Sequence, residues 1–526
     1  MRLNKKYPYY NTPHVESILD IILYQKDNNP NGVAITYKKD EQLVSKTYEN
    51  LYHDVTLLSN YFNHEYHNKR IALIGENSYN WLVTFMSIIL SGNICVIIDK
   101  DAGLDKIKEL LKKTDTKIVY YSEKYASNIS EIRLIKHQTI DDLGAYYKIG
   151  GEHQNKYKID IEKDAAIFFT SGTMGANKAV LLNQKSIVLD IIGASSLYLP
   201  EANSSVVSFL PFHHAFGLIT AGLMPIYYGV RIHINDSLKN LLTDLSEQKP
   251  YTLFAVPLFI ENFYKQIWKT ARKNHQEKAL KRGIRISNAL LKIGIDKRAK
   301  FFRKIQETFG GHLEYIICGG AYLDPSYVKW FRSIGIEILN GYGITECSPV
   351  ISVNRNFYKK DGSVGVPCKG VKVKIIDGEI CVKSDIVMKG YYKDHRATRS
   401  VIKDGYFYTG DLGYIDEDGF IFITGRKKNL IILSNGENIS PELLENALIK
   451  DKGVEEVVVY SKDNKIVAEI FPTEDYIADQ EYFDELIYKY NQDKAKNHQI
   501  AYAKLRTTEF KKNSSKKIIR SEVGKE

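Results

Sequence analysis

The sequence has few cysteines, and none of them are spaced as a metal-binding pair. Its 526 residues contain five scattered thiols and no Cys-x-x-Cys: Cys95, Cys318, Cys347, Cys368 and Cys381. An odd, scattered set predicts reduced thiols in a cytosol rather than a disulfide framework. Metal ligation through cysteine is therefore not expected.

Signals for export and for membrane insertion are also missing. The first residues lead into polar, tyrosine-rich sequence without an apolar core, so no signal peptide is expected. The best candidate for a transmembrane span, Trp81 to Ile98, is interrupted by Ser91-Gly92-Asn93. Because a span needs about 20 uninterrupted apolar residues, a buried helix followed by a buried strand is predicted there. A cytoplasmic protein is expected.

The chain lacks internal repeats, low-complexity linkers and a Walker A loop, which needs Gly-Lys-Ser/Thr leading into a helix. Residues 165–182 instead hold an apolar run ending at Thr170, the loop Ser171-Gly172-Thr173-Met174-Gly175, then Lys178 and a second apolar run. Glycines let the backbone approach a ligand closely, and successive N–H groups form an anion-binding concavity. Strand, loop and strand are predicted, with a polyphosphate as the target. An ordinary glycine-rich hairpin turn is the alternative from the loop alone.

The net charge of +10 is unevenly distributed. Thirteen lysines and arginines lie within 269–304, against only Glu277 and Asp296, and apolar residues are interleaved at helical spacing. Such amphipathic helices either form a solvated insert with their apolar face on the core, or lie on an anionic membrane surface. No recognised nucleic-acid-binding module accompanies the segment, so a nucleic-acid partner is not expected.

Short apolar runs alternate with helical patterns along the first 340 residues. These runs lie at 70–74, 94–98, 117–121, 206–210, 253–256, 314–318 and 336–339. The alternation predicts an α/β fold with parallel sheets covered on both faces. The last two runs precede Gly319-Gly320-Ala321 and Asn340-Gly341-Tyr342-Gly343, so each strand is expected to end in a glycine loop. Ligands of open α/β sheets bind at the carboxyl ends of strands.

The pattern changes after Val350. Asp377-Gly378 and Asp418-Gly419 are hairpin turn signals and predict an antiparallel β subdomain at about 351–425. Beyond Arg426, Ser440-Pro441 opens a helix and apolar strands follow, which predicts a small α+β domain. The expected division is therefore an N-terminal domain over 1–425 and a C-terminal domain over 426–526.

In this order, these segments resemble the adenylate-forming superfamily of acyl-CoA synthetases, peptide-synthetase adenylation domains and luciferases. The resemblance extends from about Ile18 to Arg520. It implies a large N-terminal domain of stacked, mostly parallel α/β sheets with a β subdomain, and a small mobile α+β C-terminal domain. The segment after Gly425 and the basic insert look most like long-chain acyl-CoA synthetases.

The resemblance also implies an ATP site. The β- and γ-phosphates would be held by Thr170, Ser171, Gly172, Thr173, Met174, Gly175 and Lys178. The adenine would be flanked, with the Tyr342 ring stacked on it, by Gly319, Gly320, Ala321, Asn340, Gly341, Tyr342 and Gly343. The α-phosphate, Mg²⁺ and the ribose would be contacted respectively by Thr345, by Glu346, and by Asp411 with Arg426.

The implied reaction joins a carboxylic acid, expected to be a fatty acid, to ATP as acyl-AMP and then to a thiol. Lys517, placed by counting back from Ile518 and Arg520, would bridge the carboxylate and the α-phosphate. His214 would border the carboxylate pocket, and Lys428 would be the hinge about which the small domain swings residues 434–438 toward the thiol. No carrier domain follows Arg520, so the acceptor is expected to be coenzyme A or the phosphopantetheine of a separate carrier protein.

Other interpretations remain open for single residues. His214 could be a structural histidine, Glu346 a helix cap, and Lys516 and Lys517 solvated charges of the tail. Met174 and Asn177 depart from the superfamily pattern, as does Lys516, which replaces a glycine. A non-catalytic nucleotide-binding or membrane-surface protein is the alternative of a different class.

Overall fold

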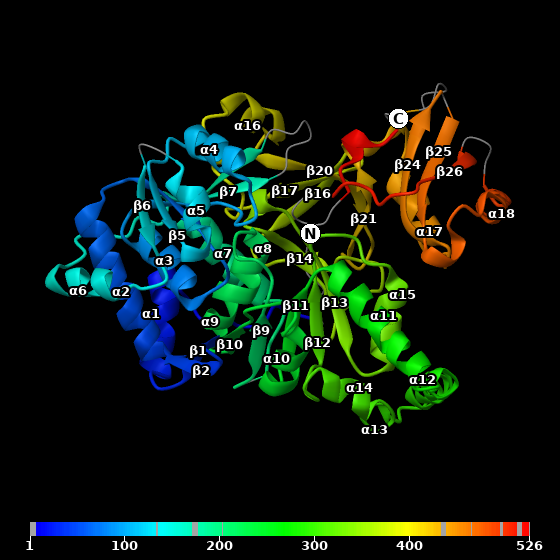
Figure 1. Cartoon of the computed structure of the whole chain (residues 1–526), viewed down its shortest axis with the longest axis horizontal. Coiled ribbons are helices and arrows are strands. Elements are labelled where there is room, and N and C mark those ends of the chain that lie inside the picture. The colour runs from blue at the N-terminus through cyan, green and yellow to red at the C-terminus, as the bar shows by residue number, and fades with distance from the viewer. Residues whose placement is uncertain are drawn as a thin grey trace. The chain divides into compact units, whose positions relative to one another are not determined.

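The computed structural model describes residues 7–132, 135–170, 177–201, 203–432, 438–463, 465–494, 498–512 and 518–524 (Figure 1). The chain forms two compact units. Unit 1 comprises Met1–Val373, Val382–Phe407 and Glu417–Ile421, and unit 2 comprises Lys374–Cys381, Tyr408–Asp416 and Phe422–Glu526. The boundaries predicted from the sequence at 351 and 425 stay predictions, because the units exchange short segments between 373 and 422.

The first sheet of unit 1 has nine strands, and its central strands are parallel. Its order is β15 (Val366–Pro367), β14 (Val350–Val353), β13 (Glu337–Gly343), β12 (Tyr315–Cys318), β11 (Thr252–Ala255), β9 (Ser205–Ser208), β10 (Arg231–Ile234), β1 (Val33–Lys39) and β2 (Gln42–Thr47). Every neighbouring pair from β13 to β1 is parallel, whereas β2, β14 and β15 are antiparallel additions.

The second sheet of unit 1 has seven strands. Its order is β18 (Gly390–Tyr391), β8 (Lys178–Asn183), β7 (Asp164–Thr170), β4 (Ile94–Ile97), β3 (Arg70–Ile74), β5 (Ile118–Tyr121) and β6 (Lys136–Thr139). The strands from β7 to β6 run parallel, and β8 lies antiparallel between β7 and β18. These two sheets confirm the predicted class of mostly parallel α/β sheets. The prediction was possible because strands buried on both faces leave apolar runs in the sequence.

The helices of unit 1 are α1 (Ile18–Asn28), α2 (Tyr48–Glu65), α3 (Tyr79–Leu90), α4 (Leu104–Lys113), α5 (Ala126–Ser130), α6 (Gly144–Glu152), α7 (Gln184–Ser195), α8 (Ala215–Leu218), α9 (Met224–Tyr228), α10 (Leu241–Gln248), α11 (Pro257–Lys273), α12 (Glu277–Lys292), α13 (Arg298–Phe301), α14 (Arg303–Thr308), α15 (Pro325–Ser333) and α16 (His395–Val401). The predicted buried helix and strand at 81–98 are α3 and β4. Among the described residues, no helix is both long and apolar enough to cross a bilayer.

Local capping follows the sequence at the start of α7. The Asn183 side chain accepts a hydrogen bond from the Ser186 N–H at 2.8 Å, as expected for a residue that satisfies a free helical donor. Ser78 caps α3 in the same way through the Trp81 N–H.

One predicted glycine loop is wrong in form. Residues 340–343 do not leave the sheet; they continue β13 and pair with β14, Gly341 opposite Val353 and Gly343 opposite Val350. A Cβ on Gly341 would lie 3.2 Å from the Ser352 carbonyl oxygen, and one on Gly343 would collide with the Pro349 carbonyl. These glycines therefore permit close strand pairing, which depends on a partner strand that local sequence does not reveal.

Unit 2 has its own core. A three-stranded sheet has the order β24 (Val454–Lys462), β25 (Lys465–Pro472) and β26 (Ile500–Leu505). Helices α17 (Pro441–Leu448) and α18 (Gln480–Asn491) pack with this sheet around a core that includes Leu444, Val457, Ala468 and Phe483. The short strands β22 (Ile431–Ile432) and β23 (Asn438–Ile439) pair with each other.

A five-stranded sheet has the order β16 (Lys372–Ile376), β17 (Glu379–Lys383), β20 (Tyr406–Ile415) and β19 (Ile402–Lys403), with β21 (Ile421–Arg426) also paired to β20. Asp377 and Gly378 both have positive φ, 49° and 77°, so they form the predicted tight hairpin turn.

A buried carboxyl group on α7 ties this helix to the start of β14. Asp190 is 1% exposed, and its Oδ1 accepts a hydrogen bond from the Val350 N–H at 2.9 Å. Its Oδ2 has no hydrogen-bond partner among the described residues. Burial raises the pKa of Asp190 well above its usual value, because the single hydrogen bond from Val350 only partly offsets the loss of solvation of the charged form.

This burial predicts that Asp190→Asn changes the pH dependence of stability. The folded state binds the Asp190 proton more tightly than the unfolded state, so wild-type stability falls as pH rises above about 4, by up to about 1.4 kcal/mol per pH unit. Asn keeps the acceptor for Val350 and cannot ionise. Its stability relative to wild type should therefore increase between pH 5.5 and 8.

Urea denaturation followed by tryptophan fluorescence measures this, since Trp81, Trp268 and Trp330 all belong to unit 1. As a control, Asp190→Ala leaves the Val350 N–H unpaired and should be less stable than Asp190→Asn at every pH. A stability difference between wild type and Asp190→Asn that does not vary with pH contradicts the assignment.

Candidate active site

The predicted phosphate loop is flanked by a paired strand on each side. Thr170 ends β7 and Lys178 begins β8, and the two residues are opposite each other in the antiparallel pair. The segment after the loop is a strand, as predicted, whereas a Walker A loop would lead into a helix. Ser171, Gly172, Thr173, Met174 and Gly175 lie outside the described residues, so their role stays a prediction.

A tyrosine hydroxyl connects Lys178 to Glu346. Lys178 Nζ donates to the Tyr391 hydroxyl at 3.4 Å and lies 4.5 Å from the centre of its ring. The same hydroxyl donates to Glu346 Oε1 at 2.9 Å. Burial, and then the charge of Glu346, raise the pKa of Tyr391, so the group is a neutral hydroxyl at physiological pH. Tyr391 was not among the residues predicted from the sequence.

Glu346 and Thr345 are placed by a short 3-10 turn, η3 (Thr345–Cys347), that follows β13. The Met388 N–H donates to the Glu346 carbonyl at 2.8 Å, and Ser348 Oγ donates to the Ile386 carbonyl at 2.8 Å. No side-chain cap is formed at the start of η3 in the described chain, and the Glu346 carboxylate instead accepts from Tyr391. The segment that ends in Tyr391 therefore holds the turn by both backbone and side chain.

The two predicted adenine-flanking segments meet in one narrow cavity of about 60 Å³. The predicted residues that line it are Gly319, Gly320, Gly341, Tyr342 and Gly343. The other lining residues are uncharged and mostly apolar: Ala194, Tyr198, Phe216, Thr220, Met224, Phe254, Ile317, Cys318, Pro349, Val350 and Val353. Ala321 follows Gly320 on the exposed side, and Asn340 lies in β13 beside Gly341. This lining suits an apolar group of a ligand and disfavours a charged one.

His214 lies at the start of α8, two residues before the cavity-lining Phe216. Its ring is 4.4 Å from the ring of His213, which is buried and has Nε2 3.2 Å from Asp99 Oδ1. Burial, aided by His214 and opposed by Asp99, lowers the pKa of His213 to about 3. His213 is therefore neutral at physiological pH.

The predicted ribose ligands come together within unit 2. Asp411 is 2% exposed in β20, and the Arg426 guanidinium Nε lies 2.7 Å from its Oδ1. Glu379, another buried residue, accepts from the Gly410 N–H at 2.8 Å and pairs with Lys427 Nζ at 2.8 Å. Glu379 was missed from the sequence; it fixes the turn before Asp411 and the residue after Arg426.

The predicted hinge and the tail also belong to unit 2. Burial, and then the charge of Arg426, lower the pKa of Lys428, which lies in the turn η4 (Lys427–Asn429). Lys516, Lys517 and residues 434–437 lie outside the described residues. On either side of the predicted catalytic lysine, Lys512 pairs with Ile518 in a β-bridge, and Arg520 forms an ion pair with Glu445.

The residues present fit a magnesium ion held mostly by phosphate. Within the described ranges there is no cluster of three or more His, Cys, Asp or Glu side chains suited to a metal. Glu346 thus offers a single carboxylate. Mg²⁺ is commonly bound through one or two carboxylates together with substrate phosphates and water.

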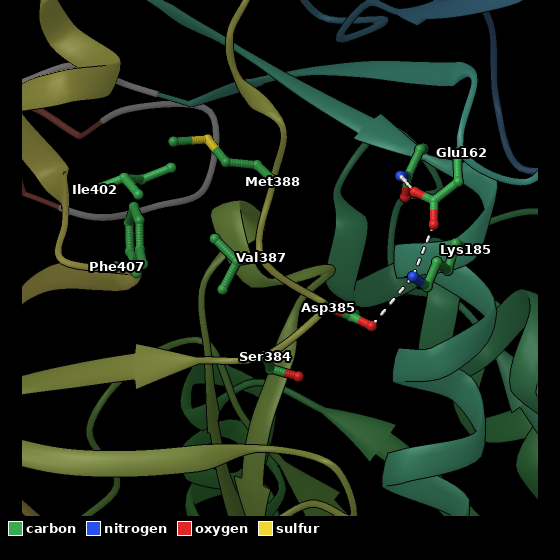
Figure 2. A pocket seen from close by; sticks show the side chains of 10 residues that line it. Glu162, Lys185, Ser384, Asp385, Val387, Met388, Ile402 and Phe407 are labelled. Atoms are coloured by element: carbon green, nitrogen blue, oxygen red, sulfur yellow. Dashed lines mark hydrogen bonds and ion pairs between the residues drawn. The ribbon is translucent and has the colours of Figure 1, made fainter.

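A second and larger cavity of unit 1, about 280 Å³, contains none of the predicted site residues (Figure 2). Lys185 Nζ lies between two carboxylates, 2.7 Å from Glu162 Oε1 and 3.2 Å from Asp385 Oδ2. The charge of Lys185 is thus compensated within the protein by these two carboxylates.

Comparison with known proteins gives one family. Residues 24–392 match the model of the family described as AMP-binding enzyme. The long-chain-fatty-acid–CoA ligase FadD15 of Mycobacterium bovis is 27% identical over 428 residues, which cover 74% of this chain and 70% of the relative. The long-chain-fatty-acid–CoA ligase 6 of Mus musculus is 28% identical over 406 residues, covering 72% and 58% of the two chains.

Solved structures share the fold over nearly the whole chain. The o-succinylbenzoate CoA synthetase of Bacillus subtilis in complex with the acyl-adenylate OSB-AMP has a TM-score of 0.76 and 19% identity, covering 96% of this chain and 97% of that one. The ATP-bound MatB of Rhodopseudomonas palustris has a TM-score of 0.77 and 20% identity, covering 96% and 97%. With strands, turns and family match in agreement, the chain belongs to the family of AMP-binding enzymes.

Proposed function

We propose that the protein is an acid–thiol ligase that converts a fatty acid to acyl-AMP with release of pyrophosphate, and then transfers the acyl group to coenzyme A. The observation that carries the proposal is a hydrogen-bonded group of three side chains in a chain of the AMP-binding family. The Tyr391 hydroxyl accepts from the Lys178 ammonium and donates to the Glu346 carboxylate. A triphosphate with its magnesium ion needs both charges, one for the phosphate oxygens and one for the metal.

The first half-reaction brings two anions together. A carboxylate oxygen attacks the α-phosphorus of ATP, and the bond from that phosphorus to the β-phosphate oxygen breaks. Cations aimed at the phosphoryl oxygens and the departing pyrophosphate supply most of the catalysis in such transfers. Lys178 and the loop from Thr170 would hold the leaving pyrophosphate, Thr345 the α-phosphate, and Lys517 both the acid and the α-phosphate. Mg²⁺ bound through Glu346 would neutralise phosphate charge.

The acid is proposed to be apolar. The cavity beside Tyr342, about 60 Å³, is lined by uncharged and mostly apolar side chains, which favour burial of the few carbon atoms next to the carboxylate. The relatives FadD15 and ligase 6 are named for long-chain fatty acids. His214 would border the carboxylate end of this cavity.

The second half-reaction is thiol attack on the mixed anhydride, which expels AMP. It needs no charge on a leaving pyrophosphate, so Lys517 is dispensable there. We infer that residues 426–526 act as the mobile C-terminal domain, with Lys428 at the hinge. Coenzyme A is the proposed thiol, and a carrier-protein phosphopantetheine is the alternative.

The direct test incubates the full chain with ATP, Mg²⁺, palmitate and coenzyme A. Mass spectrometry should detect palmitoyl-CoA together with AMP and pyrophosphate in equal amounts. Acylation of a phosphopantetheinylated carrier protein but not of coenzyme A would favour the alternative acceptor. Binding of ATP without any acyl product would instead support a non-catalytic nucleotide-binding protein.

Lys517→Ala is predicted to separate the half-reactions. Acyl-AMP formation should fall by about 10²–10³, the usual loss for one preorganised contact to a transition-state charge. Thioester formation from supplied acyl-AMP should be retained. Lys516→Ala is the matched control, and the opposite outcome for the two lysines would show that the register of the tail is displaced by one residue.

Asp411→Ala is predicted to weaken ATP use. Hydrogen bonds from ribose hydroxyls to a charged acceptor contribute about 1.5–3 kcal/mol, so the KM for ATP should rise by at least about tenfold. Asp493→Ala, at an exposed position of the same unit, is the control. An unchanged KM for ATP in Asp411→Ala counts against the ribose assignment.

We further propose peripheral contact with an anionic membrane through residues 269–304. Four apolar side chains there are 41–70% exposed: Ile286, Ile293, Ile295 and Phe301. Of the thirteen cations in this stretch, three have an acidic partner in the described chain: Arg272, Arg298 and Arg303. Exposed apolar groups among uncompensated cations are typical of a helix that lies on a lipid surface.

Vesicle sedimentation tests this contact. Binding to vesicles rich in phosphatidylserine should weaken as salt increases, because screening reduces the attraction of each lysine or arginine. Ile293→Ser should weaken binding by about tenfold or more through lost apolar burial. Leu238→Ser removes an exposed leucine of unit 1 outside the basic segment and should have no effect. Failure of the wild type to sediment at low salt removes the proposal.

A further inference from the structure

The position of Tyr391 is fixed by strand pairing, by a backbone hydrogen bond and by close packing. Its residue pairs with Val180 of β8 through the short strand β18. Its N–H donates to Thr398 Oγ1 at 2.9 Å, and its side chain is 6% exposed. Gly390 has φ of 149°, and a Cβ there would lie 2.9 Å from Thr398 Oγ1, so the chain can approach α16 this closely only without a side chain. The ring is therefore held in place before any ligand arrives.

The hydroxyl keeps two opposite charges from neutralising each other. Without it, the ammonium of Lys178 and the carboxylate of Glu346 would be free to form a direct ion pair. With it, Lys178 donates one hydrogen bond and Glu346 accepts one. An ammonium has three donors and a carboxylate several lone pairs, so both groups retain bonding capacity for a ligand.

We propose that Tyr391 is a positioning residue, which holds Lys178 and Glu346 apart and directs both at one triphosphate–magnesium unit. This inference rests on the proposed function, because it takes ATP with Mg²⁺ as the ligand. It makes Tyr391 responsible for the coupling between nucleotide and metal: removal of its hydroxyl should reduce the degree to which Mg²⁺ strengthens ATP binding.

The test is titration calorimetry of ATP binding by the full chain, with and without Mg²⁺, in the absence of any acid so that no turnover occurs. In wild type, Mg²⁺ should tighten ATP binding. In Tyr391→Phe, which keeps every ring contact, that enhancement should shrink by about tenfold, as for loss of a hydrogen bond to a charged group. Tyr392→Phe removes the neighbouring hydroxyl and should leave the enhancement at the wild-type value.

A double-mutant cycle makes the test independent of any loss of stability. In the Glu346→Gln background the metal carboxylate is gone, so adding Tyr391→Phe should reduce the Mg²⁺ enhancement no further. Equal reductions in both backgrounds, or an unchanged enhancement in Tyr391→Phe, would overturn the inference while leaving ATP binding intact. A wild-type chain that binds no ATP would overturn the proposed function and this inference together.

Discussion

A cation and a carboxylate that must serve the same ligand lose their use if they neutralise each other, and the Tyr391 hydroxyl prevents this for Lys178 and Glu346. The arrangement depends on strand pairing. β8 lies between β7 and β18, so one backbone ladder fixes both Lys178 and Tyr391. The carbonyl of Glu346 is in turn bonded by Met388, three residues before Tyr391. The pairing of these strands thus determines where the charges of Lys178 and Glu346 lie.

The other parts of the site extend from the carboxyl ends of the parallel strands. β12 ends before Gly319, and β13 continues through Gly343 because its glycines let β14 pair closely. The apolar cavity lies between these two segments, with Tyr342 in its wall. A polar nucleotide site and an apolar acyl site are expected to adjoin there, which is what joining a fatty acid to a phosphate requires. Asp411, Arg426 and Glu379 form a separate cluster in unit 2.

Much of the fold could be predicted because its causes are local. Strands buried on both faces leave apolar runs, Asn183 caps the helix that it precedes, and Asp377-Gly378 has the backbone preference of a tight turn. Tyr391 could not be predicted, because its partners lie 213 and 45 residues away in sequence. The extension of β13 was missed for the same reason, since β14 is defined only by tertiary pairing. Ser171 to Gly175 and Lys517 remain predictions from resemblance.

Acid-dependent exchange of labelled pyrophosphate into ATP, measured with the full chain and no thiol present, tests the central claim most directly. Exchange requires reversible formation of acyl-AMP and is blind to which thiol follows. The account predicts that label enters ATP only when Mg²⁺ and a carboxylic acid are both present, and faster with an apolar fatty acid than with a short polar acid. A chain that binds ATP yet exchanges no pyrophosphate above background with any acid in the panel would contradict it.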